Sequence, residues 1–350
     1  MRIEGIDLAR ALAVFGMIVV NFKLVIGATG DNAFLHGFAE LFTGKASATF
    51  VVLAGIGIAM MTNKSRRQND EITFGKRRKL LLKRAAFLFV VGLLYSPIWP
   101  ADILHFYGVY MVICVFLLKK SDKTLWFWAV TFVLGFLILI AFFDYEKGWN
   151  WADFSYSDFW RPEGFIRNLF YNGFHPVIPW TAFMIIGIWV GRKDLINLKT
   201  RKSLLINSLY VFVVAQIIIW FWQSIMASDD QFLISNSPMP PLPVYMVAGS
   251  SFAIALIILC IYLAEKIRGS LILKMLVDTG QLALTLYVAH VIVGMGAIIL
   301  YDESKLTQYS IEFTMTYVLV FCVLSVLFST VWKRYFKRGP LEILMRKVTG

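Results

Sequence analysis

Long apolar stretches recur along the chain and are separated by short segments rich in polar and charged residues. Each stretch approaches the roughly 20 residues with which a helix crosses the hydrocarbon core of a membrane. Backbone N–H and C=O groups inside lipid must pair within their own segment, and the alternation typical of membrane-spanning strands does not occur, so helices are predicted. The pattern predicts about ten spanning helices, at residues 6–27, 44–62, 84–99, 102–118, 124–143, 176–191, 203–226, 242–263, 279–300 and 311–331.

Composition agrees with this pattern. The 350-residue chain is 59% hydrophobic and 16% charged, which is more apolar side chain than a soluble protein of this length buries. We therefore predict an all-α, polytopic helical bundle integral to the cell membrane, with residues 1–350 forming a single transmembrane domain. Residues 144–175 are crowded with aromatic and carboxylate side chains, which favours a membrane-interfacial outer loop; a lid over an outward-facing acceptor site is the alternative.

The basic residues are distributed by side of the membrane. If both termini are cytoplasmic, most of the 34 Lys and Arg residues fall on the inner side, which is the positive-inside pattern and favours an even number of spans. The net charge of +12 therefore reflects topology, and without a base-stacking or zinc motif we expect no nucleic acid partner. The outer side keeps only Lys23, Lys45, Lys147, Arg161, Arg167 and Lys305.

Four histidines are the main candidates for chemistry. His36, His105 and His175 lie at the outer ends of predicted spans, and His290 lies about midway through the ninth. Imidazole exchanges protons near physiological pH, so we expect a catalytic histidine among His36, His105 and His290. A hydrogen-bonding strut between helices is the alternative for each of them.

Neighbouring side chains extend this interpretation. Asp102 precedes His105 by three residues on one helical face, where it can orient the ring and stabilise its protonated form. The alternative is that Asp102 caps the start of the helix. Tyr287 shares a face with His290 and is the further catalytic candidate.

Other interior polar groups are expected to contact substrate. His175, Trp180 and Asn21 are the candidate acceptor-binding residues, and Asn21 or Tyr287 could steady an oxyanion. The sequence contains no H-x-x-x-H or H-x-x-E-H spacing, and the cysteines are scattered, so we expect no metal. Those cysteines are Cys114, Cys260 and Cys322.

The inner side carries the candidate donor-binding residues. Asp7 and Arg10 lie one turn apart at the start of the first helix, either as a structural ion pair or with Arg10 lining a portal for the donor. Residues 63–84 are interpreted as a basic loop, which either fixes topology beside anionic lipid or docks a phosphate-rich donor. Its candidate donor-binding residues are Arg77, Arg78, Lys83 and Arg84.

Several motifs resemble a known family. They include "RIEGIDLARALAVFGMIVVNF", "FVVLAGIGIAM", "ILHFYGVYM", "HPVIPWTAFMIIGIWVGR", "GQLALTLYVAHV" and "GPLEILMRK", in this order over nearly the whole chain. Together they resemble the YeiB-type family of bacterial membrane proteins. That family is similar to a wider group of transmembrane acyltransferases that includes heparan-alpha-glucosaminide N-acetyltransferase.

The wider resemblance implies transfer of an acyl group from cytoplasmic acyl-CoA, acetyl-CoA above all, to an acceptor on the far side. It also implies a catalytic histidine before the Gly-rich second span, and His36, upstream of Gly55 and Gly57, best matches that position. The Asp and Phe-Pro that follow the histidine in the glucosaminide enzyme are missing from "HGFAELFTGKASATF". His105, with its own Asp102, is therefore the competing base.

These observations predict a membrane-embedded acyltransferase that acetylates a hydroxyl or amine acceptor, with a histidine as general base. Direct transfer and an acyl-histidine intermediate both stay open. The alternatives are a secondary transporter or flippase for a small or lipidic substrate, and a non-catalytic membrane scaffold. Expected partners are membrane lipids and an extracytoplasmic glycan, lipid or small-molecule acceptor, with a homodimer left open.

Overall fold

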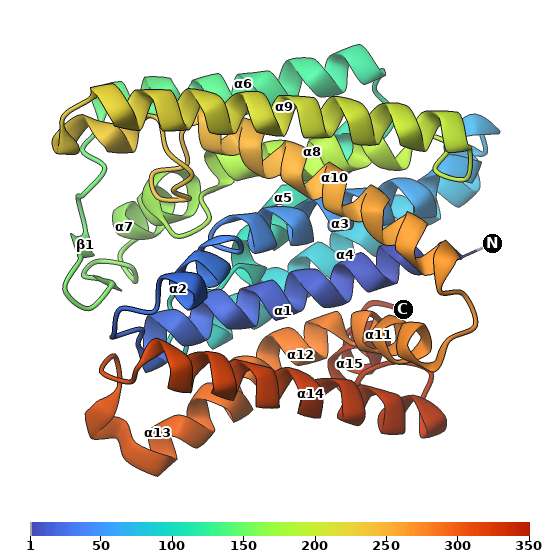
Figure 1. Ribbon diagram of the computed structural model, residues 1–350. Coiled ribbons are helices and arrows are strands. Elements are labelled where there is room, and N and C mark those ends of the chain that lie inside the picture. The colour runs from blue at the N-terminus through green and yellow to red at the C-terminus, as the bar shows by residue number, and fades with distance from the viewer. Residues whose placement is uncertain (1) are drawn as a thin grey trace. The chain divides into compact units, whose positions relative to one another are not determined.

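Helices make up almost all of the structure, a computed structural model that describes residues 2–350 except the side chain of Asp229 (Figure 1). In this part of the chain the only strands are two residues long and pair antiparallel, β1 (Trp149–Asn150) with β2 (Ser155–Tyr156). The all-α prediction is confirmed.

Seven helices within residues 2–350 are long and apolar enough to cross a membrane, or eight if one bent pair counts as a single span. The expected number of about ten is not confirmed, although a helix occupies each predicted stretch. The helix at Leu104–Leu117 has 14 residues, and the one at Val177–Gly191 has 15. In the helix at Glu71–Tyr95 basic residues continue as far as Arg84, which leaves too short an apolar part.

Two compact units make up the chain. Unit 1 contains the residues up to Phe50 and Ala255–Lys347, and unit 2 contains Val51–Ile254 and Val348–Gly350. The single transmembrane domain over residues 1–350 stays a prediction. Three helices run across the boundary between the units: α3 (Lys45–Arg67), α10 (Pro243–Lys266) and α15 (Pro340–Thr349).

Unit 1 is built around its first helix, α1. α1 packs against α2, α11, α12 and α14, and it lies beside α14 in Figure 1. Gly5 and Gly280 allow close approach, because a Cβ at Gly280 would collide with the carbonyl of Asp7 and one at Gly5 with the backbone of Ile261. The elements of unit 1 are α1 (Glu4–Ile26), α2 (Ala33–Glu40), α11 (Leu271–Gln281), α12 (Ala283–Ala289), the π-helix η3 (His290–Met295), α13 (Gly296–Asp302), η4 (Glu303–Lys305) and α14 (Ile311–Tyr335).

The motif "GPLEILMRK" near the C-terminus contains Glu342, which caps a helix of unit 1. The Glu342 carboxylate accepts the backbone N–H groups of Leu284 at 2.9 Å and Thr285 at 3.2 Å, and the Thr285 hydroxyl at 2.6 Å. These bonds satisfy N–H groups that the first turn of α12 leaves unpaired. Glu342 thereby fixes the start of the helix that carries Tyr287 and leads to His290.

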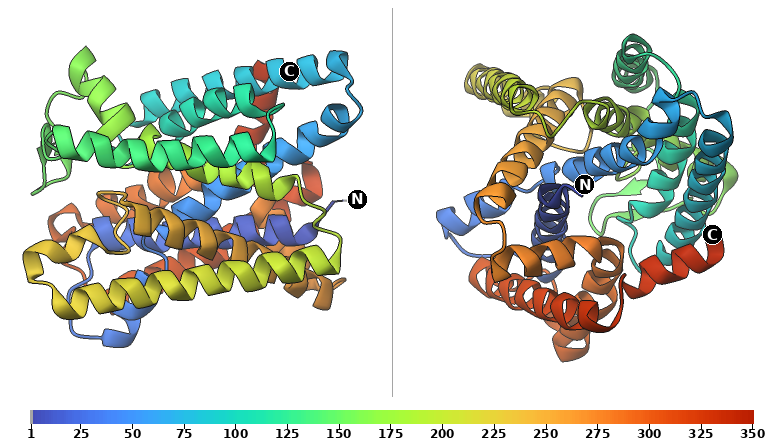
Figure 2. Two further views of the ribbon diagram at one scale, coloured as in Figure 1. Left: turned by 90° about the horizontal axis from the view of Figure 1, so that it is seen from above. Right: turned by 90° about the vertical axis from the view of Figure 1, so that its right-hand side faces the viewer.

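Unit 2 packs α4 against α5, and α8 against both α5 and α6. α4 and α5 lie side by side in Figure 2. α3 and α8 approach each other closely at two glycines. A Cβ at Gly55 would collide with the carbonyl of Met184, and one at Gly187 would collide with that of Val52, so the close approach requires glycine at both positions. The elements of unit 2 are α4 (Glu71–Tyr95), α5 (Leu104–Leu117), α6 (Asp122–Phe142), β1, β2, α7 (Pro162–Arg167), the π-helix η1 (Asn168–Asn172), α8 (Val177–Gly191), α9 (Leu198–Ile225) and η2 (Ser228–Leu233).

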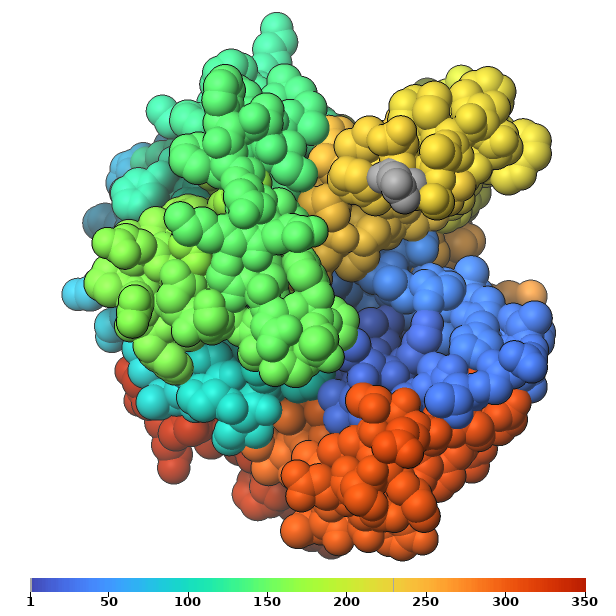
Figure 3. All heavy atoms as spheres, turned by 90° about the vertical axis from the view of Figure 1, so that its left-hand side faces the viewer, coloured from blue at the N-terminus to red at the C-terminus, as the bar shows by residue number. Residues whose placement is uncertain are grey.

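Residues 144–175 form an ordered segment held by one buried amide. Asn172 donates to the carbonyls of Tyr145 and Lys147 and accepts the Tyr156 hydroxyl at 2.7 Å. In Figure 3 these residues, in green, pack into one continuous surface. Their place at the membrane interface stays a prediction.

Residues 63–84, expected as a loop, are mostly helical. α3 continues to Arg67 and α4 begins at Glu71, so only a short turn separates them. Asp70 ends this turn by accepting the backbone N–H of Thr73 at 2.9 Å. The basic side chains are therefore presented from helices.

Candidate functional site

Asp102 and His105 form a buried pair at the start of α5. The Asp102 Oδ2 atom lies 3.0 Å from His105 Nδ1 and also accepts the backbone N–H of His105 at 3.1 Å, so Asp102 both orients the ring and caps the helix. Asp102 is 0% exposed and His105 is 1% exposed. Donation from Nδ1–H to the carboxylate assigns the tautomer that leaves a lone pair on Nε2. That Nε2 atom is buried without a hydrogen-bond partner.

A glycine of α4 makes room for this pair. A Cβ at Gly92 would lie 2.6 Å from Asp102 Oδ2 and would also collide with the backbone nitrogen of His105. Gly108, one turn along α5, faces the carbonyl of Ala85 in the same way. The two glycines let α4 and α5 pack closely enough to enclose the carboxylate. The sequence analysis missed Gly92, because a lone glycine in an apolar run carries no signal of its neighbour.

His175 and Trp180 lie next to the pair. His175 sits between η1 and α8, and its carbonyl accepts the Tyr110 hydroxyl. The ring of Phe106 is close to both histidines, with its centroid 4.0 Å from that of His105 and 6.1 Å from that of His175. The Trp180 ring centroid is 4.7 Å from that of His175.

This group, which we call the His105 cluster, consists of Asp102, His105, His175 and Trp180. Besides His105 Nε2, the His175 Nδ1 and Trp180 Nε1 atoms are buried without a hydrogen-bond partner. Buried polar atoms in folded proteins are nearly always hydrogen-bonded, since leaving one unpaired costs about 1–3 kcal/mol. Three such nitrogens in one group of neighbouring side chains make this group a candidate binding site. Phe106 and Tyr110, which contact residues of the cluster, were not among the sequence candidates.

Unit 1 contains a second buried histidine. The Asn21 amide nitrogen lies 2.9 Å from His290 Nε2, and the Tyr287 ring centroid is 5.3 Å from that of His290. His290 is fully buried at the first position of η3, and π-helical turns are frequent at functional sites. The structure thus brings Asn21, Tyr287 and His290 together, and their catalytic and substrate-binding roles stay predictions.

His36 has a different environment. It lies on α2 in unit 1, half-buried, and its Nε2 donates to the carbonyl of Gly30 at 2.9 Å. Asn32 caps α2 by accepting the backbone N–H of Leu35 at 3.1 Å. This ring is held by a neutral carbonyl, which stabilises an imidazolium less than a carboxylate does.

The expected donor-binding residues fall into two groups. In unit 1 the Asp7 carboxylate accepts Arg10 at 2.5 Å and Arg2 at 2.6 Å, so the Asp7–Arg10 pair is present and Arg2 joins it. In unit 2, α4 carries the other four. Arg77 and Lys83 are exposed, Arg84 is half-buried, and the guanidinium of Arg78 lies 4.8 Å from the centroid of the Phe116 ring. Binding of a donor by either group stays a prediction.

No group of three or more His, Cys, Asp or Glu side chains among residues 2–350 could hold a metal ion. The His105 cluster itself offers ring nitrogens and one carboxylate. A histidine fixed by a carboxylate, with a free Nε2, can remove a proton from a hydroxyl or an amine.

Known proteins resemble the chain from end to end. Residues 2–220 match the family model described as heparan-alpha-glucosaminide N-acetyltransferase, catalytic, and residues 190–350 match one described as a protein of unknown function, DUF418. Uncharacterized protein YeiB of Escherichia coli (strain K12) is 24% identical, with 98% of this chain and 95% of YeiB aligned. Uncharacterized protein YxaH of Bacillus subtilis (strain 168) is 22% identical, with 99% of this chain and 94% of YxaH aligned.

The expected resemblance to YeiB-type proteins is thus confirmed. The first family model covers more than half of the chain. With seven helices fit to cross a membrane among its described residues, the chain is a multi-pass membrane protein, and it belongs to the heparan-alpha-glucosaminide N-acetyltransferase catalytic family.

Proposed function

We propose that this protein transfers an acetyl group from acetyl-CoA to a hydroxyl or amine acceptor, with His105 as the general base. The observation that carries the proposal is the buried Asp102–His105 pair, in which a carboxylate occupies Nδ1 and Nε2 has no partner. A general base needs a fixed tautomer and a lone pair within reach of the proton it removes. Family membership supports acetyl-CoA as the donor.

In the proposed reaction, Nε2 of neutral His105 takes the acceptor's proton while the acceptor oxygen or nitrogen attacks the thioester carbonyl. Asp102 stabilises the imidazolium that forms. The tetrahedral intermediate collapses by breaking the C–S bond, and the proton on Nε2 passes to the departing thiolate, so CoA leaves as the free thiol. The Trp180 Nε1–H group, buried and unpaired, supplies a donor for the oxyanion.

His105 is preferred to His36 as the base for a physical reason. The proposed imidazolium lies beside a buried carboxylate at His105 but beside a backbone carbonyl at His36. Charge stabilisation is stronger where water is excluded, and His36 is only half-buried. His36 keeps the position that the family resemblance implies, so both histidines enter the test.

The test measures transfer from radiolabelled acetyl-CoA to glucosamine by the full-length protein in liposomes. Glucosamine is the probe because the family description names a glucosaminide. We expect His105→Ala and Asp102→Asn to lower kcat by about 100-fold or more, since general base catalysis contributes at least that factor. We expect His36→Ala to keep most of the activity.

Two results would contradict the proposal. Loss of transfer in His36→Ala alone, with His105→Ala active, would reassign the base while leaving acetyl transfer intact. Failure of saturating acetyl-CoA to raise the melting temperature of the wild-type protein would reject acetyl transfer itself. Melting temperatures of the variants show whether each has folded.

Transport is the second candidate because one pair of helices is broken beside the cluster. Pro162–Asn172 and Val177–Gly191 bend by 46° at the break that contains His175. Discontinuous helices of this kind build the binding sites of many secondary transporters. Transport would be favoured if liposomes with the protein took up a solute together with protons and His175→Ala abolished that uptake. Acetyl-CoA should then leave the melting temperature of the protein unchanged.

A further inference from the structure

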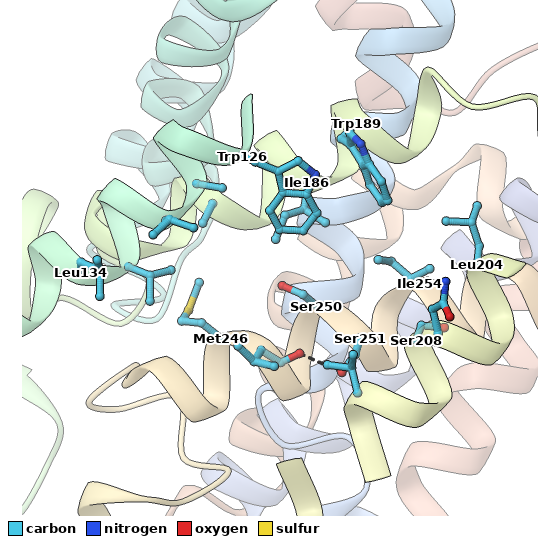
Figure 4. A pocket seen from close by; sticks show the side chains of 17 residues that line it. Trp126, Leu134, Ile186, Trp189, Leu204, Ser208, Met246, Ser250, Ser251 and Ile254 are labelled. Carbon is cyan, nitrogen blue, oxygen red and sulfur yellow. Dashed lines mark hydrogen bonds between the residues drawn. The ribbon is translucent and has the colours of Figure 1, made fainter. Parts of the chain in front are cut away.

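Unit 2 contains an apolar cavity apart from the His105 cluster. It has a volume of about 370 Å³ and lies among α6, α8, α9 and α10 (Figure 4). The view shows Trp126 and Trp189 on one side of the cavity, with Met246 and Ser250 across from them. The volume is more than twice the roughly 150 Å³ of an apolar cavity that holds one benzene ring.

The walls of the cavity are apolar and leave few polar atoms to contact a ligand. The rings of Trp126 and Trp189 meet edge to face with centroids 5.2 Å apart. Ser251 and Ser208 lie in the opposite wall, and their hydroxyls are bonded to carbonyls of their own helices. The Ser250 hydroxyl is buried without a partner, so its removal breaks no hydrogen bond. A site of this kind favours a flexible hydrocarbon group over a sugar or a nucleotide.

One end of the cavity carries positive charge. The Lys193 ammonium lies 4.7 Å from the centroid of the Trp189 ring and pairs with Asp122 at 2.8 Å. Lys123 precedes Trp126 by three residues on α6, so it shares a helical face with a lining residue. We call Lys123, which is exposed, and Lys193, which is half-buried, the cationic rim.

We propose that this cavity binds one acyl chain of an anionic phospholipid from the surrounding membrane, with the headgroup at the cationic rim. Hydrocarbon chains are the apolar groups that surround a spanning helix. α6 and α9 are mostly not covered by protein, since only 17% of each spanning window is buried. Basic residues at the ends of spanning helices attract anionic headgroups, which supplies the charge complementarity. The proposal does not depend on acetyl transfer.

The test is native mass spectrometry of the detergent-solubilised, full-length protein with palmitoyl-oleoyl phosphatidylglycerol or the matching phosphatidylcholine. We expect a saturable adduct of one phosphatidylglycerol, bound about fivefold or more tightly than phosphatidylcholine. Ser250→Leu fills the cavity and should reduce the phosphatidylglycerol adduct to the level of phosphatidylcholine, whereas Ser250→Ala should keep it. Ser224→Leu, at an exposed position of α9, is the matched control and should bind as wild type.

A second pair of variants tests the rim without touching the cavity. Lys123→Gln, at an exposed position, should weaken phosphatidylglycerol binding by about fivefold, because each basic residue near anionic lipid contributes about that factor. Lys79→Gln, at an exposed position of α4, should leave phosphatidylglycerol binding unchanged. Equal binding of the two lipids, an undiminished adduct in Ser250→Leu, or equal effects of the two lysine substitutions would each overturn the proposal.

Discussion

At the scale of single residues, the surroundings of each histidine decide what it can do. His105 has a carboxylate on Nδ1 and nothing on Nε2, whereas His290 shares Nε2 with the Asn21 amide and His36 binds a backbone carbonyl. A carboxylate on Nδ1 fixes the ring so that Nε2 can accept a proton during the reaction. An amide donor on Nε2 occupies the lone pair instead. Among these three histidines, only His105 combines a carboxylate on one ring nitrogen with an unpaired second nitrogen.

Asp278 gives a prediction about pH. Burial raises the pKa of this carboxyl above its ordinary value, and the opposing attraction of Lys333, Lys274 and Arg2 only partly offsets that effect. Ionising Asp278 is thus harder in the folded protein than in the unfolded chain. Its contribution to stability is fully present below the pKa of the unfolded chain and is lost as pH rises through the higher folded pKa.

We therefore expect Asp278→Asn to raise the melting temperature at pH 7, and the gain should shrink as the pH falls toward 4. Melting curves in detergent across this range provide the measurement. Asp31→Asn, the same substitution at an exposed position, is the control and should show no such trend. A lower melting temperature for Asp278→Asn at pH 7 would mean that the ionised carboxylate stabilises the fold through its basic neighbours.

At the scale of elements, glycines decide which helices approach closely. Gly92 and Gly75 both lie on α4, but a Cβ at Gly92 meets Asp102 and His105, whereas one at Gly75 meets no atom within 4 Å. Small residues at helix crossings let backbones approach and so position side chains between them. The geometry of the His105 cluster thus depends on α4 as much as on α5.

We expect Gly92→Ala to destabilise the protein by about 1–3 kcal/mol, as overpacking usually does, and to lose acetyl transfer because the carboxylate is displaced. Gly75→Ala is the matched control, and it should leave activity unchanged and stabilise α4 by up to about 1 kcal/mol through its better helix propensity. Melting temperature and transfer rate are measured on both. If Gly92→Ala and Gly75→Ala changed the melting temperature and the transfer rate equally, the close contact of Gly92 with Asp102 and His105 would not determine the geometry of the site.

Hydropathy and spacing predicted much of this architecture. A run of apolar residues indicates a helix whatever its neighbours are, and the three-residue spacing of Asp102 and His105 indicated their contact before any tertiary structure was known. The number of spans was less predictable, because α5 is short and the apolar part of α4 is reduced by its basic residues. The contact between His175 and Phe106 could not be predicted from the sequence, because it joins α5 to the segment between η1 and α8, about 70 residues later.

At the scale of the whole molecule, the polar ends of the helices gather by side within each unit. In unit 2, Arg192 at the end of α8 donates to the carbonyls of Leu118 and Lys120 and pairs with Asp122 at 2.9 Å. These are ends that the charge pattern assigns to the cytoplasm. In unit 1, Gly27 after α1 bridges to Gln308 before α14, and both belong to the expected outer side. In each unit, helix ends that the charge pattern assigns to the same side of the membrane therefore contact one another. The cytoplasmic location of the termini stays a prediction.

That location can be tested by labelling single cysteines in the full chain. With Cys114, Cys260 and Cys322 replaced by alanine, we introduce a cysteine at Gln68 in the turn before α4 or at Ala152 in the segment after α6, both exposed positions. Because basic residues stay on the cytoplasmic side, a membrane-impermeant maleimide should label Ala152→Cys in intact cells and Gln68→Cys only after lysis. The reverse pattern would invert the topology and move the His105 cluster to the cytoplasmic side, where acetyl-CoA and acceptor would meet without crossing the membrane.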